Sequence, residues 1–197
     1  MRLLVRAAAV AVSLALMPVL PADATTARYD VQVVPGGPLL PFTRAAADRV
    51  LLADKVAAAK YGTPAPIDDP VREKAILEAV AAKSREWGID PEASVRIFRD
   101  QIEAKKVVQR EWYRRWDSGQ AEPPAERPDL GQIRPLIDKL NAVLLDEIRL
   151  TVDVRARPSC VTKQTRAYVA VVVEKRLDPL HATALARALT SLCAMLR

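Results

Sequence analysis

The amino-acid sequence predicts an all-α protein with a single helical domain. Apolar residues recur along most of the chain at the three- and four-residue spacing of amphipathic helices, and no segment alternates cleanly as a half-buried strand does. Glycine, which weakens helices, contributes only 6 of the 197 residues. Three Asp-Pro pairs mark helix starts, because aspartate caps free backbone amides and proline suits the first helical position. These pairs are Asp69-Pro70, Asp90-Pro91 and Asp178-Pro179.

Six helices are expected, and the breaks between them are also marked. In chain order the helices cover residues 42–61, 70–87, 91–116, 132–154, 159–175 and 179–195. The first is followed by a Gly-Thr-Pro-Ala-Pro turn at residues 62–66, and Gly88 ends the second. The segment from Asp117 to Asp129 contains three prolines, so we expect an exposed loop there.

Residues 1–24 have the features of a secretory signal peptide. Arg2 and Arg6 provide a positive start, residues 7–20 are apolar, and residues 22–24 read Ala-Asp-Ala, a small-x-small cleavage pattern. The apolar stretch is about fourteen residues, short of the roughly 20 that span a bilayer, so an uncleaved anchor is the weaker alternative. We therefore expect cleavage after Ala24, a periplasmic or secreted location, an extended arm over residues 25–41 and a helical domain over residues 42–197.

The chain is basic, but its basic residues are not concentrated in one region. Its formal net charge is +6, and removal of residues 1–24, with two arginines and one aspartate, leaves +5. Basic residues alternate with acidic ones, so the pattern favours neither a nucleic-acid surface nor a cationic membrane-binding helix. We expect no nucleic-acid partner and no stable membrane association after cleavage of the signal peptide.

Cys160 and Cys193 are the only cysteines, and both fall in the C-terminal helical region. In an oxidising compartment a lone pair most simply forms a structural disulfide; free thiols and a metal site are the alternatives. A zinc site is disfavoured because there is no Cys-x-x-Cys and His181 is the only histidine. We expect His181 to be exposed near the start of the last helix, and we expect no metal or cofactor.

Long polar side chains stand at helical spacing within the apolar-patterned segments. Eleven residues separate Arg49 from Lys60, so three helical turns bring them to within roughly 20° of one direction. Lys105 and Gln109 are neighbours on one helix face, whereas Lys106 and Asp100 of the same helix are expected to be mostly solvated. Each residue taken alone is most simply a solvated surface group. If their faces converge, they form a cationic pocket for a small, multiply charged anion.

These segments together resemble the secreted gamma subclass of the AroQ chorismate mutases, an all-α family. The resemblance runs from Arg44 to Cys193, and it is carried by DRVLLADKVAAAKY, DDPVREKAIL, IFRDQIEAKKVVQ, the helix that contains Arg134, and the two cysteines. The segment that contains Arg134, RPLIDKLNAVLLDEI, also has the pattern of the first helix in the cytoplasmic members of the family. The resemblance implies conversion of chorismate to prephenate by a unimolecular Claisen rearrangement, without nucleophile, metal or cofactor. It also implies a homodimer in which each site lies inside one protomer.

The resemblance implies catalytic roles for five residues. Arg49 and Arg134 would bind the substrate carboxylates, and Arg72 would lie over the enolpyruvyl side. Lys60 and Gln109 would donate hydrogen bonds to the ether oxygen. Conformational restriction and preorganised donors would then lower the barrier. Because an amide donates at any pH, the activity should be flat from about pH 5 to 8.

Three further residues are implied to bind substrate. Glu73 would accept a hydrogen bond from the ring hydroxyl, with Asp69 one turn earlier on the same face; Asp69 also reads as a helix cap. Lys105 replaces the short hydroxyl residue that is usual in the family. It would either contact a substrate carboxylate or extend away to solvent. The competing interpretation of the whole chain is a secreted helical protein that binds an anionic metabolite without turnover.

Overall fold

The computed structural model describes residues 37–193, and helices are the only regular secondary structure in that range. Their bounds are η1 Gly37–Leu39, α1 Leu40–Lys60, α2 Pro70–Glu86, α3 Pro91–Asp117, α4 Leu130–Leu150, α5 Val152–Arg155, α6 Cys160–Glu174 and α7 Pro179–Ala188. The prediction of an all-α fold is confirmed. No helix among these residues is long and apolar enough to cross a bilayer. The predicted signal peptide and residues 25–36 of the predicted arm lie outside the described range.

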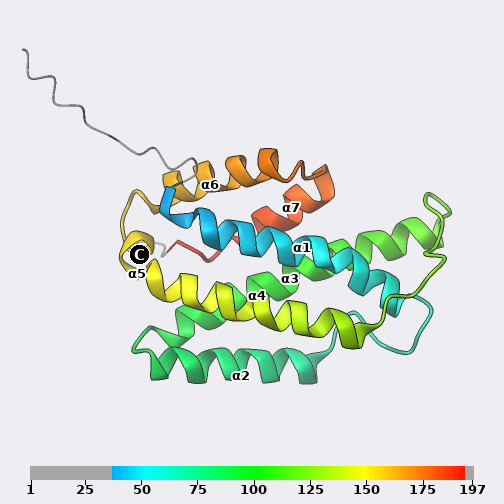
Figure 1. Ribbon diagram of the computed structural model, residues 1–197, viewed down its shortest axis with the longest axis horizontal. Helices are drawn as coiled ribbons and strands as arrows, with labels where there is room; N and C mark the ends of the chain where they lie inside the picture. The colour runs from blue at the N-terminus through cyan, green and yellow to red at the C-terminus, as the bar shows by residue number, and fades with distance from the viewer. Residues whose placement is uncertain (1–36, 194–197) are drawn as a thin grey trace, which may run out of the picture. The chain divides into compact units, whose positions relative to one another are not determined.

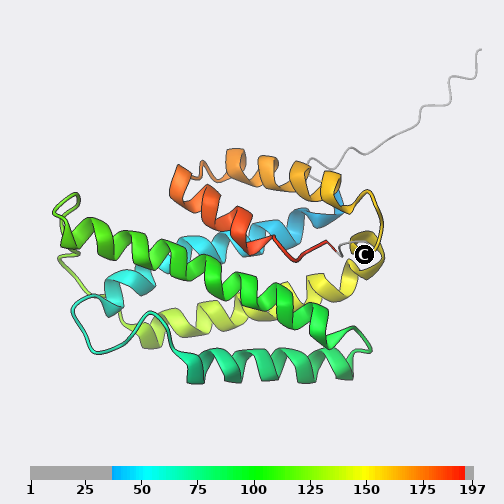
Figure 2. The same cartoon turned by 180° about the vertical axis from the view of Figure 1, so that it is seen from behind.

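Helix α1 runs through the middle of the fold and packs against both α3 and α4 (Figure 1). Helix α2 packs on α3, on the side away from α7. The α6 and α7 pair covers the other side of α1, where α7 also packs on α3 and α6 on η1 (Figure 2). Side chains from α1 to α4 can therefore converge, while α6 and α7 support α1 and α3 from behind.

Aspartate caps start four of the helices. The carboxylate of Asp69 accepts from the amide of Arg72 at 3.0 Å, and Asp90 and Asp178 cap α3 and α7 in the same way. The fourth cap is Asp129, whose Oδ1 accepts from the Gly131 amide at 2.7 Å. Helix α4 consequently begins at Leu130, two residues before the predicted start.

Three further helix bounds differ from the sequence prediction by two residues or more. Residues 37–41, predicted as part of the extended arm, form η1 and the start of α1, where proline occupies an early helical position. The predicted fourth helix is interrupted at Thr151, whose hydroxyl donates to the Glu147 carbonyl. The last helix ends at Ala188 because the Ser191 amide bonds the side chain of Asp100 at 2.8 Å. Asp100 also pairs with Arg187 and is buried, so its predicted solvation is wrong.

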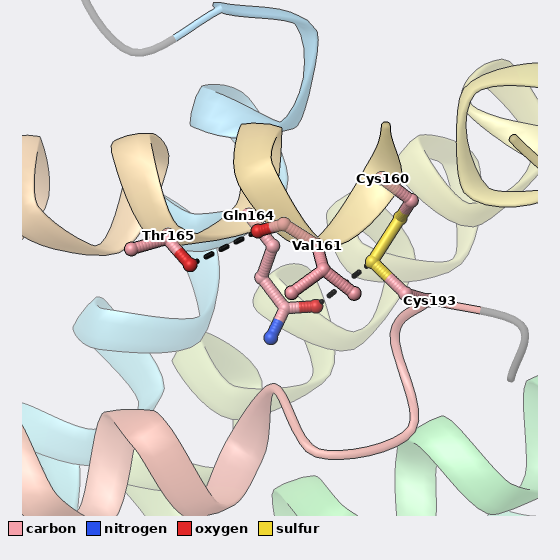
Figure 3. Close-up of a disulfide and its surroundings, with 5 residues drawn as sticks. All are labelled: Cys160, Val161, Gln164, Thr165 and Cys193. Atoms are coloured by element: carbon pink, nitrogen blue, oxygen red, sulfur yellow. Dashed lines mark hydrogen bonds between the residues drawn. A yellow bond between two sulfur atoms is a disulfide. The ribbon is translucent and has the colours of Figure 1, made fainter. Parts of the chain in front are cut away.

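A disulfide between Cys160 and Cys193 joins the first turn of α6 to the segment after α7 (Figure 3). This confirms the predicted pairing. The two Cα atoms lie 5.7 Å apart, and Gln164 Oε1 lies 3.1 Å from the Cys193 sulfur. The cysteines are 33 positions apart in sequence, so closing this loop stabilises the fold by about 3–4 kcal/mol in the chain-entropy model.

The prediction that His181 is exposed is wrong, because the ring is buried between α7 and α1. Its Nδ1 lies 2.9 Å from Asp178 Oδ1, and its Nε2 lies 2.9 Å from Asp54 Oδ1. Carboxylates only accept hydrogen bonds, so both ring nitrogens carry hydrogen and the ring is an imidazolium. Asp54 also accepts from the indole of Trp112 on α3, at 2.6 Å. The histidine therefore joins α7 to α1 at a point where α3 is also bound.

Stability should depend on the charge of His181. The hydrogen bond with Asp54, opposed by burial and reinforced by Asp178, raises the pKa of His181 above its ordinary value. A raised folded-state pKa means that the stabilisation is complete below about pH 6.5 and is lost as pH rises through the folded-state value. We expect His181→Gln to lower the free energy of unfolding by about 1–3 kcal/mol at pH 5.5, and by less at pH 9. Urea unfolding of both proteins at the two pH values measures this, and an equal difference at both would contradict it.

Candidate active site

A cavity of about 80 Å³ lies where helices α1 to α4 meet the segment 61–69. Its polar lining consists of Lys60, Asp69, Arg72, Glu73, Lys105 and Arg134. All six were predicted from the sequence as site residues, and they come from four different helices and the segment before α2. Its apolar lining consists of Val56, Ala65, Pro66, Ile67, Leu130 and Ile137.

The charges on the cavity wall are suited to a dianion. Four of the six polar lining residues are cationic and two are acidic, so the wall has a formal charge of +2. Two of the cations are arginines, whose planar guanidinium groups bind carboxylates through two parallel hydrogen bonds.

Arg49 is buried behind this wall on α1 and is only 4% exposed. Neither terminal nitrogen of its guanidinium has a hydrogen-bond partner within the described residues. Burial, opposed in part by Asp138, lowers the pKa of Arg49 to about 10, so the group is still charged at neutral pH. A buried cation without acceptors is costly unless an anion reaches it. Arg49 is therefore the strongest local indication of a bound anion.

Lys60, at the end of α1, donates to the Pro66 carbonyl at 2.7 Å. The bond ties the end of the helix to the segment that lines the cavity. Burial, together with the charges of Arg134 and Arg72, lowers the pKa of Lys60, while Asp69 opposes this shift. Lys60 also lines the cavity, so its ammonium lies near the other cavity charges.

Lys105 lines the cavity from α3 and does not extend away to solvent. Burial, reinforced by Arg49, Lys60 and Arg72, lowers its pKa to about 8, and Glu73 partly opposes the shift. Arg49, Lys60 and Arg72 are therefore close enough to Lys105 to act on its charge. An anion placed there would restore the ordinary preference of the lysine for its charged form.

Gln109 lies one turn after Lys105 and is buried, at 1% exposure. Its Nε2 donates to the Lys105 carbonyl at 3.1 Å, and its Oε1 has no partner within the described residues. One of the two Nε2 hydrogens remains for another acceptor. Like Arg49, Gln109 lies behind the cavity wall rather than on it.

Glu73 lies in the first turn of α2, and its Oε1 accepts from the Asp69 amide at 3.3 Å. The same oxygen lies 2.8 Å from Nζ of Lys106. The prediction that Lys106 is mostly solvated is therefore wrong: its side chain is buried and reaches back to Glu73 and Asp68. The helical pattern could not reveal this, because Asp68 lies outside any helix and pairs across a long sequence distance.

Apart from Asp69, the contribution of the segment 61–69 to the cavity could not be predicted from the sequence. This segment provides Ala65, Pro66 and Ile67 to the cavity, and its proline-rich composition indicated only a turn. Ile76, one helical turn after Arg72, lines an adjoining cleft between α2 and α4. No group of three or more potential metal-ligating side chains occurs within residues 37–193.

Comparison with known proteins places these features in one family. Residues 43–110 match the sequence profile described as chorismate mutase type II. The secreted chorismate mutase of Mycolicibacterium smegmatis is 37% identical over 156 residues, covering 79% of this chain and 86% of that protein. The secreted chorismate mutase of Mycobacterium tuberculosis is 36% identical over 149 residues, which cover 76% of this chain and 75% of that protein. A crystal structure of a chorismate mutase from Burkholderia phymatum matches with a TM-score of 0.75 and 33% identity, covering 81% of this chain and 98% of that one.

Proposed function

Because this chain belongs to the family of secreted chorismate mutases, we propose that the cavity between α1 and α4 is where it converts chorismate to prephenate. The chain is an isomerase of that family, so a protein that only binds a metabolite is not favoured. The observation that supports this location most strongly is the convergence of four cations around one cavity. Behind it lies buried Arg49, whose terminal nitrogens have no hydrogen-bond partner among residues 37–193. Such an arrangement needs an anionic ligand to complete its hydrogen bonds.

Arg49, Arg72 and Arg134 would hold the two carboxylates of chorismate. Arg72 and Arg134 approach from α2 and α4 on the cavity wall, and Arg49 approaches from α1. Restricting the substrate to the compact conformer that can rearrange removes much of the entropic barrier. Lys60 and the free Nε2 hydrogen of Gln109 would stabilise the charge that develops on the ether oxygen.

Glu73 would accept a hydrogen bond from the ring hydroxyl. Its Oε1 already contacts Lys106 and the Asp69 amide, which leaves Oε2 for the substrate. Asp69 lines the cavity next to it and caps α2 through the Arg72 amide at 3.0 Å. The cap also holds the backbone of Arg72 at the cavity.

The function is tested by adding purified protein to chorismate and following the loss of chorismate absorbance, with prephenate identified by NMR. A mutase consumes chorismate catalytically at substoichiometric enzyme. Saturable binding of chorismate without its conversion would instead establish the metabolite-binding alternative and overturn the proposal.

Lys105 would contact a substrate carboxylate, because it lies among the cavity cations rather than at the surface. We expect Lys105→Ser to raise KM about 10-fold, the effect of losing one charged hydrogen bond, and to change kcat less. In the wild type, kcat/KM should fall above about pH 8 as Lys105 loses its proton, and the serine variant should lack this decline. Lys74→Ser, which removes an exposed lysine of α2, is the control. An unchanged KM and an unchanged alkaline decline would contradict the contact.

The location and assembly extend this proposal. The relatives are named as secreted proteins, and residues 1–24, with their apolar stretch and Ala-Asp-Ala pattern, would be a signal peptide cleaved after Ala24. Residues 42–197 would then be the catalytic domain. A homodimer would be consistent with the half-exposed apolar residues Leu136, Val143 and Leu150, which recur every seven residues along α4.

A further inference from the structure

We propose that Lys106 is a positioning residue for the reaction: its ammonium holds Glu73 in place and joins the segment 61–69 to α3. This inference rests on the proposed role of Glu73 toward the substrate hydroxyl. Lys106 itself is not on the cavity wall, whereas its neighbour Lys105 is. Two adjacent lysines on one helix therefore have different functions, one toward the substrate and one toward the residues that receive it.

The ammonium of Lys106 is buried and lies within 3.0 Å of three carboxylates. The side chain is 7% exposed, and Nζ lies 2.8 Å from Glu73 Oε1, 3.0 Å from Asp68 Oδ1 and 3.0 Å from Glu103 Oε1. Burial by itself lowers the pKa of Lys106, but the hydrogen bonds with the three carboxylates outweigh it and raise the pKa above its ordinary value. The group is therefore a fixed positive charge with a fixed geometry.

Glu73 depends on Lys106 more than the other two carboxylates do. Its side chain is 13% exposed, whereas those of Glu103 and Asp68 are 31% and 57% exposed, so water can replace the lysine only for these two. Asp68 has a second cation as well, Arg110, at 2.8 Å. Of the three carboxylates, only Glu73 lines the cavity.

Lys106 also decides which cation Glu73 pairs with. The Glu73 carboxylate acts electrostatically on Lys105, one of the cavity lysines proposed to bind the substrate. With Lys106 in place, Oε1 is held on the outer side by an ammonium and by the Asp69 amide. Without Lys106, the Glu73 carboxylate could turn to the cavity cations, and pairing with them would occupy the groups that the substrate needs. The charged groups around this carboxylate are Lys60 on α1, Asp68 and Asp69 before α2, Arg72 and Lys74 on α2, Arg99, Glu103, Lys105 and Lys106 on α3, and Arg134 on α4.

The test is a double-mutant cycle of Lys106→Met with Glu73→Gln, read out as kcat/KM for chorismate. We expect Lys106→Met alone to lower kcat/KM by about 10- to 100-fold, the cost of a displaced binding group. In the Glu73→Gln background it should lower kcat/KM by less than about threefold, because the carboxylate that it positions is gone. Lys106→Arg, which keeps the charge, should recover most of the lost activity. Lys74→Met, at an exposed lysine paired with Glu78 on α2, should leave kcat/KM and the melting temperature unchanged.

The possible outcomes separate this inference from the proposed function. The positioning role is overturned if Glu73→Gln lowers kcat/KM but Lys106→Met does not. It is also overturned if the loss of kcat/KM in the double variant equals the product of the two single losses. In both cases the proposed site stands. If Glu73→Gln leaves kcat/KM unchanged, the role of Glu73 falls and the inference falls with it. Should the methionine variant fail to fold, Lys106→Gln retains donors for the carboxylates without the charge, and the same cycle is run with it.

Discussion

Replacing Arg49 with methionine should remove most of the mutase activity and yet make the fold more stable. The guanidinium is buried, and its terminal nitrogens have no partner within the described residues. Methionine has a similar length and needs no hydrogen bonds. We expect the free energy of unfolding to rise by about 1–3 kcal/mol, the usual cost of a buried unsatisfied polar group. We expect kcat/KM to fall by about 100- to 1,000-fold, because a cation that holds a substrate carboxylate in the reactive conformer is lost.

Arg44→Met is the matched control for this prediction. Arg44 lies on the same helix, but it is exposed and paired with Glu174 at 2.8 Å. Its removal should leave kcat/KM unchanged and should change stability by less than about 1 kcal/mol. Urea unfolding and the chorismate assay measure both quantities on all three proteins. A less stable Arg49→Met variant would mean that Arg49 holds the fold together, and a fully active one would remove Arg49 from the site.

The opposite changes expected in stability and activity for Arg49→Met would follow from the proposed role of the site in binding a dianion. A protein that must bind a dianion has to hold cations close together before the anion arrives. Burial therefore lowers the pKa values of Arg49 and Lys105, with neighbouring cations adding to the effect on Lys105. Binding of the proposed dianion would offset both costs and so contribute to the binding free energy.

The helices could be predicted from the sequence because their signals are local. Aspartate caps such as Asp69 and Asp178 bond amides within three residues, and the apolar spacing depends only on the helix itself. The bounds that the sequence missed depend on distant partners. The end of α7, for example, is set by Asp100, which lies on α3.

The cavity residues could be predicted only partly, for a related reason. Arg72 and Arg134 are recognisable because their segments resemble a family motif, and Lys105 because it stands at a position of that motif. The structure brings all three to one cavity. His181 and Lys106 carry no such signal. Both are charged residues that the helical pattern assigns to the surface, and both are buried because carboxylates far along the chain fold against them. A single sequence cannot show which distant acid meets which base.

Replacing Gln109 with glutamate should also change the activity strongly, and it should make the activity depend on pH. We expect Gln109→Glu to lower kcat/KM by about 100- to 1,000-fold at pH 8, because an ionised carboxylate cannot donate to the ether oxygen. Activity should return as pH falls and the new carboxyl gains a proton, so the variant should show an acidic optimum. The wild type should be flat from about pH 5 to near pH 8, since an amide donates at every pH and Lys105, with a pKa of about 8, keeps its charge below that.

Gln101→Glu on the same helix separates this effect from a general cost of placing a carboxyl in the protein interior. Gln101 is also buried, at 2% exposure, and its Nε2 likewise donates to a backbone carbonyl, that of Ala188, at 2.8 Å. This control should lose stability at high pH, yet the folded fraction should keep the flat activity profile of the wild type. The measurement is kcat/KM from pH 4.5 to 8 for all three proteins, with the folded fraction determined at each pH. A flat profile for Gln109→Glu would mean that the side chain at position 109 does not donate to the reacting oxygen, and that Lys60 stabilises the developing charge without it.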